Sequence, residues 1–353
     1  NWDKMYDLYS NYLKYAYTPN VLGSIIDEMI GEVNASHTGF YPRRDKFDKS
    51  YSRAYLGGDF NRAEFPENGI YFENVYYLSK LKTLHGIEKN DILLAVDNEP
   101  IGKDRVVAPL LKDKVDQKIK LKVLKDGKTK EIHLKGLSYW ENRNLYYKDW
   151  VNTRKQKVDR LSEGRIGYLH IRGMEFTSYE KFLDDLWTSN FDKDALIIDI
   201  RNNGGGWTHD MILEVLTKKS YGFTSRRYYD DKLNKTPART YEKPIVLLIN
   251  KNSFSDAEIF PHIFKKLNLG KVIGTPTSGS VIGTGHISFM DGSSMRMPSN
   301  GWFYNDKARN KLINMEGSGA EPDILVEQSP EELEKDNDVQ LKRAVKELFK
   351  QLD

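Results

Sequence analysis

Residues 243–258 read KPIVLLINKNSFSDAE, and this stretch decides the fold that we expect. The apolar run 245–249 is bounded by turn-forming residues, and apolar side chains at helical spacing follow it. The pattern predicts a buried strand that leads through a polar turn into a helix starting near Asp256. Ser255 would then lie at the N-terminus of that helix, where unpaired N–H groups and the helix dipole favour negative charge.

Two roles fit Ser255. It forms a capping box with Glu258, because a serine at the N-cap and a glutamate three residues later satisfy free backbone N–H groups. A serine at this place is also suited to a reaction that creates an oxyanion, because the helix N-terminus stabilises negative charge. The segment alone leaves both roles open.

The composition excludes several classes of protein. The 353 residues suggest two or three domains, and the absence of cysteine excludes disulfides, thiolate metal sites and a cysteine nucleophile. Lys+Arg at 54 against Asp+Glu at 51 gives a net charge of only +3, without the basic stripe that nucleic-acid binding needs. The apolar runs are too short for a membrane span, and we expect no cofactor and no metal. Because the chain opens with Asn1 and shows no signal peptide, it reads as a processed or excised piece of a longer protein.

A second strand–turn–helix pattern carries three glycines. The buried strand 195–200 runs into RNNGGGW at 201–207. A dinucleotide fingerprint would need a glycine where His209 stands, and no Lys-Ser/Thr pair follows the glycines as a phosphate-binding loop requires. Glycines here can bring backbone N–H groups close to a reacting atom, as an oxyanion hole demands, or can simply make a tight turn.

The rest of the chain divides into three parts. Residues 1–57 predict two amphipathic helices followed by a polar turn that carries Ser36 and His37. Residues 58–137 alternate as strands, with a hairpin turn at Asp126-Gly127. Residues 138–353 begin with a connecting segment and then alternate strands with helices, which predicts an α/β core with a largely parallel sheet covered on both faces.

The middle part resembles a PDZ domain. Residues 68–71 read NGIY and match the carboxylate-binding loop, and residues 86–96 read GIEKNDILLAV and match a second PDZ segment, with Asn90 in the usual glycine place. The resemblance implies capture of an extended peptide end by strand addition at Gly69, Ile70 and Tyr71. A small β-rich domain without a ligand is the alternative.

Three segments of the last part resemble the core of the tail-specific (carboxy-terminal processing) and tricorn-type serine proteases. They read DIRNNGGG at 199–206, SDAE at 255–258 and GTPT at 274–277. This resemblance implies a crotonase/ClpP-like α/β protease core with an N-terminal helical segment and an inserted β-rich PDZ domain. Tail-specific proteases pair their serine with a lysine, but Ser280 stands in that slot and residues 272–306 contain no lysine.

The tricorn-type branch uses a Ser-His pair ahead of the PDZ domain and a late glutamate. EVNASHT at 32–38 resembles the first motif, and MEGSGAEPD at 315–323 resembles the second. The resemblance implies that Ser255 attacks a peptide carbonyl, that His37 is the general base, and that Ser36 bridges Glu316 to His37. Glu321 is the less favoured candidate for the glutamate.

The resemblance also implies the oxyanion hole and the partners. The backbone N–H groups of Gly205 or Gly206 and of Asp256 would bind the oxyanion. The substrate would be a peptide or an unfolded protein, and the chain would form a homo-oligomer, with β-propeller domains ahead of this region either missing or never present. Tricorn-type proteases are cytoplasmic and tail-specific ones work in the cell envelope, so the compartment stays open.

Two other functions stay open. In the first, the PDZ-like block binds peptides and Ser255 only caps its helix. In the second, the chain is a crotonase-like acyl-thioester enzyme, because glycine-derived oxyanion holes suit that chemistry too. The PDZ-like insert and the Ser-His pair favour the peptidase.

Overall fold

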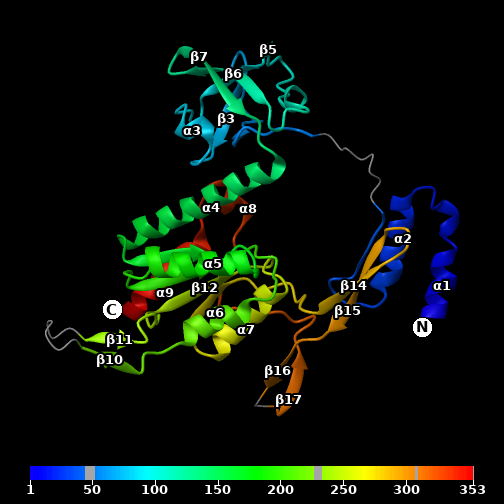
Figure 1. Ribbon diagram of the computed structural model, residues 1–353, viewed down its shortest axis with the longest axis vertical. Coiled ribbons are helices and arrows are strands. Elements are labelled where there is room, and N and C mark those ends of the chain that lie inside the picture. The colour runs from blue at the N-terminus through cyan, green and yellow to red at the C-terminus, as the bar shows by residue number, and fades with distance from the viewer. Residues whose placement is uncertain (44–51, 226–232, 307–308, 353) are drawn as a thin grey trace. The chain divides into compact units, whose positions relative to one another are not determined.

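The computed structural model describes residues 1–43, 52–225, 233–306 and 309–352 (Figure 1). The chain forms two compact units: Asn1–Arg44 together with Arg154–Asp353, called the core unit below, and Asp45–Thr153, called the inserted unit. These boundaries differ from the expected ones at 57/58 and 137/138. The reason at the second boundary is α4 (Tyr139–Ser162), a continuous helix of 24 residues without Gly or Pro, where the sequence suggests only a connecting segment.

The core unit is built on a five-stranded sheet in the order β18-β13-β12-β9-β8, with every neighbouring pair parallel. Its strands are β8 (Ile166–His170), β9 (Ala195–Asp199), β12 (Ile245–Ile249), β13 (Lys271–Gly274) and β18 (Ile324–Leu325). All residues of β8, β9 and β12 are buried, as expected for central parallel strands with both faces covered.

Helices cover both faces of this sheet. The helices and helical turns of the core unit are α1 (Trp2–Ser10), η1 (Leu13–Tyr15), α2 (Pro19–Gly31), α5 (Phe176–Asp184), η3 (Asp185–Ser189), α6 (His209–Thr217), α7 (Asp256–Lys266), α8 (Pro330–Glu334) and α9 (Val339–Leu352). Alternate strand residues such as Ile198 and Leu247 share one hydrophobic cluster with α5, α6 and α7. The equally buried Ile197 and Leu248 point the other way, and α9 packs against β9, β12 and β13. The predicted mixed α/β core is therefore confirmed.

The remaining strands of the core unit form antiparallel pairs. They are β1 (Gly39–Tyr41), β10 (Gly222–Thr224), β11 (Asn234–Thr236), β14 (Gly283–Ser288), β15 (Ser294–Asn300), β16 (Phe303–Asp306) and β17 (Lys311–Asn314). β1 pairs with β15, which itself pairs with β14 in a hairpin. This pairing ties the N-terminal segment to a part of the chain about 250 residues later, and so brings the turn before β1 to the second half of the sequence.

The inserted unit is an antiparallel sheet in the order β2-β3-β4-β6-β7, with β5 paired to β4. Its elements are β2 (Gly58–Phe60), β3 (Ile70–Val75), α3 (Lys80–Thr83), β4 (Ile92–Val96), β5 (Glu99–Pro100), η2 (Ala108–Leu111), β6 (Lys118–Lys125) and β7 (Lys128–Lys135). β6 and β7 meet at Asp126 and Gly127, both with positive φ, as the predicted hairpin turn requires. This unit has its own hydrophobic core.

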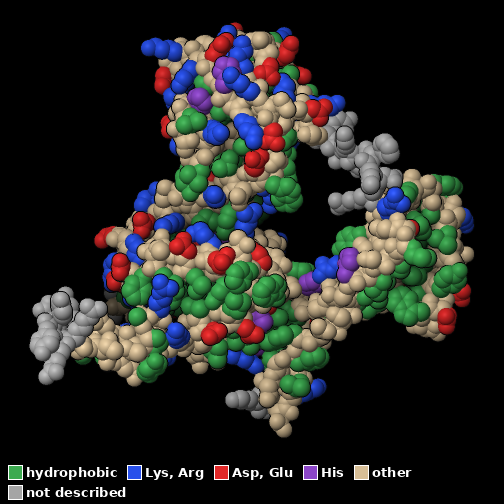
Figure 2. All heavy atoms as spheres, in the orientation of Figure 1, with side chains coloured by type: hydrophobic (Ala, Val, Ile, Leu, Met, Phe, Trp, Pro, Cys, Tyr) green, Lys and Arg blue, Asp and Glu red, His purple; other side chains and the backbone are tan. Residues whose placement is uncertain are grey.

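The surface mixes charges of both signs. Figure 2 shows Lys and Arg interspersed with Asp and Glu on the face drawn, and hydrophobic side chains gathered over the N-terminal helices. Trp2, Tyr6, Leu8 and Tyr12 are among the exposed apolar residues of that segment. Within the described ranges, no helix combines the length and the apolar character that crossing a lipid bilayer demands.

Candidate active site

Ser255 lies in the turn between β12 and α7, at the carboxyl end of the parallel sheet, where α/β folds of this kind bind ligands. It is the N-cap of α7 and has φ 58° and ψ −122°, a backbone conformation that residues other than glycine rarely adopt. Its backbone N–H donates to Ser280 O (3.0 Å) and to Glu258 Oε1 (3.1 Å). These bonds hold the strained residue in place.

Glu258 organises the surroundings of Ser255. Its side chain is fully buried, and five groups donate to its carboxylate. These donors are Ser255 N–H (3.1 Å), Thr277 Oγ1 (2.6 Å), Ser278 Oγ (3.0 Å), Gly279 N–H (2.5 Å) and Ser280 N–H (2.8 Å). A buried carboxylate needs such donors because nothing else replaces its hydration. The segment after β13 therefore wraps around Glu258, and Ser280 uses its backbone groups to fix Glu258 and Ser255.

Ser36 and His37 lie in the turn between α2 and β1. Ser36 Oγ is 2.8 Å from His37 Nδ1, and His37 itself has φ 61°. The imidazole packs against Phe254, the residue before Ser255, with ring centroids 4.5 Å apart. Among the described residues, no hydrogen bond joins Ser255 to His37. Catalytic hydrogen bonds are often long before substrate binds, so this geometry does not argue against the pair.

Glu316 anchors this turn. Its Oε1 accepts from Ser36 N–H (2.8 Å), and its Oε2 accepts from the N–H groups of Val281 (2.8 Å) and Ile282 (2.9 Å). Burial alone would raise the pKa of Glu316, but hydrogen bonds from the backbone and side chain of Ser36 and from the two backbone N–H groups lower it. Glu316 is thus held as a carboxylate beside Ser36.

The structure separates the two glutamate candidates. Glu316 contacts Ser36 directly, whereas the described bond of Glu321 is that of its backbone carbonyl with Lys265 Nζ (3.1 Å).

The charge of His37 depends on its neighbours. Burial lowers its pKa below the ordinary value of 6.5, and the positive charge of Arg296 lowers it further, while Glu316 and Glu258 act in the opposite direction. Arg296 lies on β15, and its guanidinium donates to Thr284 Oγ1 at 2.7 and 3.1 Å. The balance favours the neutral imidazole, the form that accepts a proton.

The glycine loop after β9 lies against Ser255. Phe254 N–H donates to Asn203 O (2.9 Å), because β9 and β12 are neighbours in the sheet and their following loops meet. A Cβ at Gly205 would lie 2.6 Å from Ser255 Cβ and 3.0 Å from Asp256 N, so only glycine fits there.

The three expected oxyanion donors are not equivalent. Gly205 N–H donates to Asn203 Oδ1 (2.9 Å) and is already used. The N–H groups of Gly206 and Asp256 have no acceptor among the described residues, and Asp256 is the first residue of α7. Gly205 therefore lets the glycine loop lie close to Ser255, and the N–H groups of Gly206 and Asp256 remain as free donors among the described residues.

A buried ion network supports the start of this loop. Arg201 binds Asp199 (2.7 Å), Asp338 (2.9 Å) and Gln340 (3.0 Å), and all four side chains are buried. Because Asp338 precedes α9, the network joins the end of β9 to the C-terminal part of the chain. Burial alone would raise the pKa of Asp338, but Arg201 outweighs it and lowers that pKa.

Sequence reasoning missed two features of the site. Glu258 reads only as a capping residue, although the hydroxyl-rich run 275–280 could have suggested an acceptor among donors. His209 reads only as the residue that breaks a nucleotide motif, yet it binds Asp256 through its backbone N–H (3.0 Å to Oδ2) and through Nδ1 to Oδ1.

In the described ranges, no group of three or more His, Asp or Glu could hold a metal ion.

Gly69, Ile70 and Tyr71, where the PDZ resemblance predicts strand addition, lie at and just before the start of β3, and peptide capture there stays a prediction. β3 lies between β2 and β4: Asn61 N–H donates to Tyr71 O (3.0 Å) on one side, and Ile70 pairs with Leu93 on the other. Arg105 Nη1 donates to Gly69 O (2.7 Å). The edge strands of this sheet are β2 and β7.

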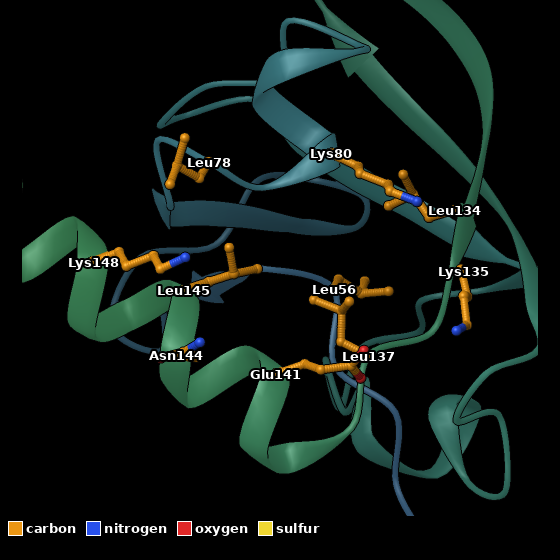
Figure 3. A pocket seen from close by; sticks show the side chains of 10 residues that line it. All are labelled: Leu56, Leu78, Lys80, Leu134, Lys135, Leu137, Glu141, Asn144, Leu145 and Lys148. Atoms are coloured by element: carbon orange, nitrogen blue, oxygen red, sulfur yellow. The ribbon is translucent and has the colours of Figure 1, made fainter. Parts of the chain in front are cut away.

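A cavity of about 280 Å³ lies elsewhere in the inserted unit (Figure 3). Five leucines and three lysines make up most of its lining, which consists of Leu56, Leu78, Lys80, Leu134, Lys135, Leu137, Glu141, Asn144, Leu145 and Lys148. Figure 3 shows the side chains contributed by α4, among them Leu145 and Lys148. Residues 69–71 are not part of this lining.

Comparison with known proteins adds relatives to this geometry. Residues 165–326 match Peptidase family S41. The chain is 28% identical over 362 residues to the tricorn protease of Thermoplasma volcanium, which covers 99% of this chain and 34% of that protein. It is 30% identical over 366 residues to a tricorn-like protease C-terminal subunit of Sulfurisphaera tokodaii, covering 100% of this chain and 41% of that protein.

A solved structure shows the same likeness. A crystal structure of the tricorn protease matches with a TM-score of 0.85 and 25% identity, over 99% of this chain and 34% of that chain. The chain thus spans between a third and two-fifths of the length of these relatives.

Proposed function

We propose that this chain, whose residues 165–326 match Peptidase family S41, is a serine-type protease that hydrolyses peptide bonds with Ser255 as the nucleophile. The observation that carries the proposal is the connected series Glu316–Ser36–His37, with the imidazole against Phe254. Ser36 and Glu316 are 280 positions apart in sequence. They meet beside His37, whose ring packs against Phe254 in the turn that carries Ser255.

The proposed reaction is acyl transfer through a Ser-His-Ser-Glu tetrad. His37 Nδ1–H donates to Ser36 Oγ, and Ser36 is held by Glu316, so Nε2 is free to take a proton. Ser255 Oγ forms a bond to the peptide carbonyl carbon while His37 accepts its proton. The C–N bond then breaks, and His37 returns the proton to the leaving amine. Water, deprotonated by His37, releases the acyl group and restores Ser255.

The free donors support the same step. The N–H groups of Gly206 and Asp256 would bind the oxyanion, and each such donor contributes about 3 kcal/mol, roughly a hundredfold in rate. The positive end of α7 lies beside Ser255 and favours the same charge.

A fluorophosphonate probe tests the proposal. We expect labelling of Ser255 in the wild type, no labelling in Ser255→Ala, and at least a hundredfold slower labelling in His37→Ala. Fluorogenic peptides should lose cleavage in both variants, while Ser189→Ala, which removes an exposed serine, keeps both activities. No labelling of a folded, fully assembled wild type would contradict the proposal.

A peptide-binding role for the inserted unit is the second candidate function, favoured by its cavity lined mostly by leucines and lysines. Binding of a fluorescent peptide to Ser255→Ala, measured by anisotropy in the same experiment, distinguishes it. Binding together with a wild type that does not label would leave only the peptide-binding function. Thioester turnover that survives Ser255→Ala would instead favour the acyl-thioester enzyme.

A further inference from the structure

His209 joins the two segments that supply the proposed oxyanion donors. It is the first residue of α6 and follows Gly206 by three positions, whereas Asp256 begins α7 directly after Ser255. Both oxygens of the Asp256 carboxylate are bound: Oδ2 accepts from His209 N–H (3.0 Å), and Oδ1 is hydrogen-bonded to His209 Nδ1. The side chains of His209 and Asp256 are 15% and 4% exposed, so water competes little for this contact.

Other contacts also hold the loop that carries Gly206. Phe254 N–H donates to Asn203 O, which fixes the loop ahead of Gly205. Gly206 itself has φ 149°, a region open chiefly to glycine. Asn202 bonds to Asn250 and Asn252 of the same turn, and Ile200 O accepts from Ser253 Oγ. These bonds all lie ahead of Gly205, whereas the contact of His209 with Asp256 lies after Gly206. Without His209, Asp256 would keep its place in α7 but lose its bond to the segment that carries Gly206.

We propose that His209 is a positioning residue for peptide hydrolysis: by binding the Asp256 carboxylate, it holds the N–H groups of Gly206 and Asp256 at the spacing that the oxyanion requires. The inference rests on the proposed function of Ser255. His209 does not act on substrate itself, because Nδ1 binds Asp256 and Nε2 lies 3.2 Å from Asp210 Oδ1. A displacement of about 1 Å at such a site can cost roughly a hundredfold in rate.

The charge of His209 makes the contact dependent on pH. The charged groups that act on it are Asp256 on α7 and Asp210 on α6 itself. Burial alone would lower the pKa of His209, but these two carboxylates raise it above the ordinary value of 6.5. The imidazolium–carboxylate pair is therefore complete below pH 6.5 and weakens as the pH rises through the raised pKa.

Three variants test the inference, measured by peptide cleavage across pH and by fluorophosphonate labelling. His209→Ala should lower kcat by about 10- to 100-fold with KM changed less than about threefold, because transition-state binding is lost. His209→Asn should recover most of kcat, since its amide N–H can occupy the place of Nδ1–H. Because asparagine does not titrate, this variant should not show the fall in kcat that the wild type shows as the pH rises through the pKa of His209. The control His133→Gln replaces an exposed histidine of β7 and should behave as wild type.

Each outcome decides the matter. A wild type that labels at Ser255, with His209→Ala keeping wild-type kcat and pH profile, overturns the inference. If His209→Ala is unfolded by thermal melting, His209→Asn decides, and a wild-type alkaline profile in that variant overturns it. The labelling of the folded wild type tests the proposed function separately from any substitution of His209. If the folded wild type does not label, the proposed function is overturned, and the positioning role with it.

Discussion

At the scale of single residues, burial and then Arg296 lower the pKa of His37, the proposed base. The charge of Arg296 acts from β15, the strand that also pairs with β1. A base whose pKa lies below the working pH stays neutral and ready to accept a proton. The arrangement would therefore extend the proposed activity toward lower pH.

Arg296→Gln should move the acidic limb of kcat/KM to higher pH. Without the guanidinium charge, the pKa of His37 rises, so a higher pH is needed to keep it neutral. The pH profile of peptide cleavage measures this. Arg296→Lys keeps the charge and should leave the limb in place, as should Arg309→Gln at an exposed position. A limb that moves equally in Arg296→Lys would assign the effect to the lost bonds with Thr284.

At the scale of elements, the turn from β12 into α7 depends on the buried carboxylate of Glu258, which forms no ion pair with any described residue. Five hydrogen bonds and the N-terminus of α7 stabilise Glu258, and in return Glu258 fixes the segment 277–280 and the N–H of Ser255. Glu258, the N3 residue of the capping box, thus also fixes the conformation of the turn.

Glu258→Ala should lower the free energy of unfolding by roughly 3–5 kcal/mol, because its buried donors lose their acceptor together. Labelling of Ser255 should fall with it. Denaturant unfolding followed by fluorescence measures the first effect. Glu334→Ala, an exposed glutamate of α8, should change stability by less than about 0.5 kcal/mol. A loss below about 1 kcal/mol in Glu258→Ala would contradict this account.

Elements explain which parts of the site the sequence predicts. Ser255 is found because a strand, a turn and a helix each leave a local pattern, and the hairpin of β6 and β7 at Asp126-Gly127 is found for the same reason. The pairing of β2 with β3 is not found from the sequence, because β2 has only three residues and no clear periodicity. The contact of His209 with Asp256 joins two helix starts 47 residues apart and leaves no local signal.

At the scale of the whole molecule, the described chain holds separate hydrophobic cores. The cluster around β9 and β12 belongs entirely to the core unit, and the cluster around β3, β4 and β6 belongs entirely to the inserted unit. Each core buries large aromatic side chains, among them Phe260 in the first and Phe72 in the second.

Calorimetry should therefore resolve two unfolding transitions. Phe72→Ala should destabilise the inserted unit by about 3–5 kcal/mol and lower only its transition, and Phe260→Ala should do the same to the core unit. Leu84→Ala, at an exposed position, serves as the control. A single transition that shifts in both variants would show that the units unfold together.

Local sequence patterns do not predict which distant segments of the chain meet at the candidate site. Ser36 lies just before β1, which pairs with β15, and it bonds to Glu316. The segment after β13 then links Glu316 to Ser255, because Val281 N–H bonds to Glu316 and Ser280 O accepts from Ser255 N–H. Their family resemblance supplies the expectation, and the pairing of distant strands supplies the physical reason.

Ser255 and His37 both hold backbone conformations with positive φ, 58° and 61°. Each costs roughly 1–2 kcal/mol for an ordinary L-residue, a cost without benefit once catalysis is no longer needed. A descendant that survives only as a scaffold would gain stability by exchanging both residues for glycine. Such a pair of exchanges would be the mark of a pseudoenzyme, legible in a sequence before any assay.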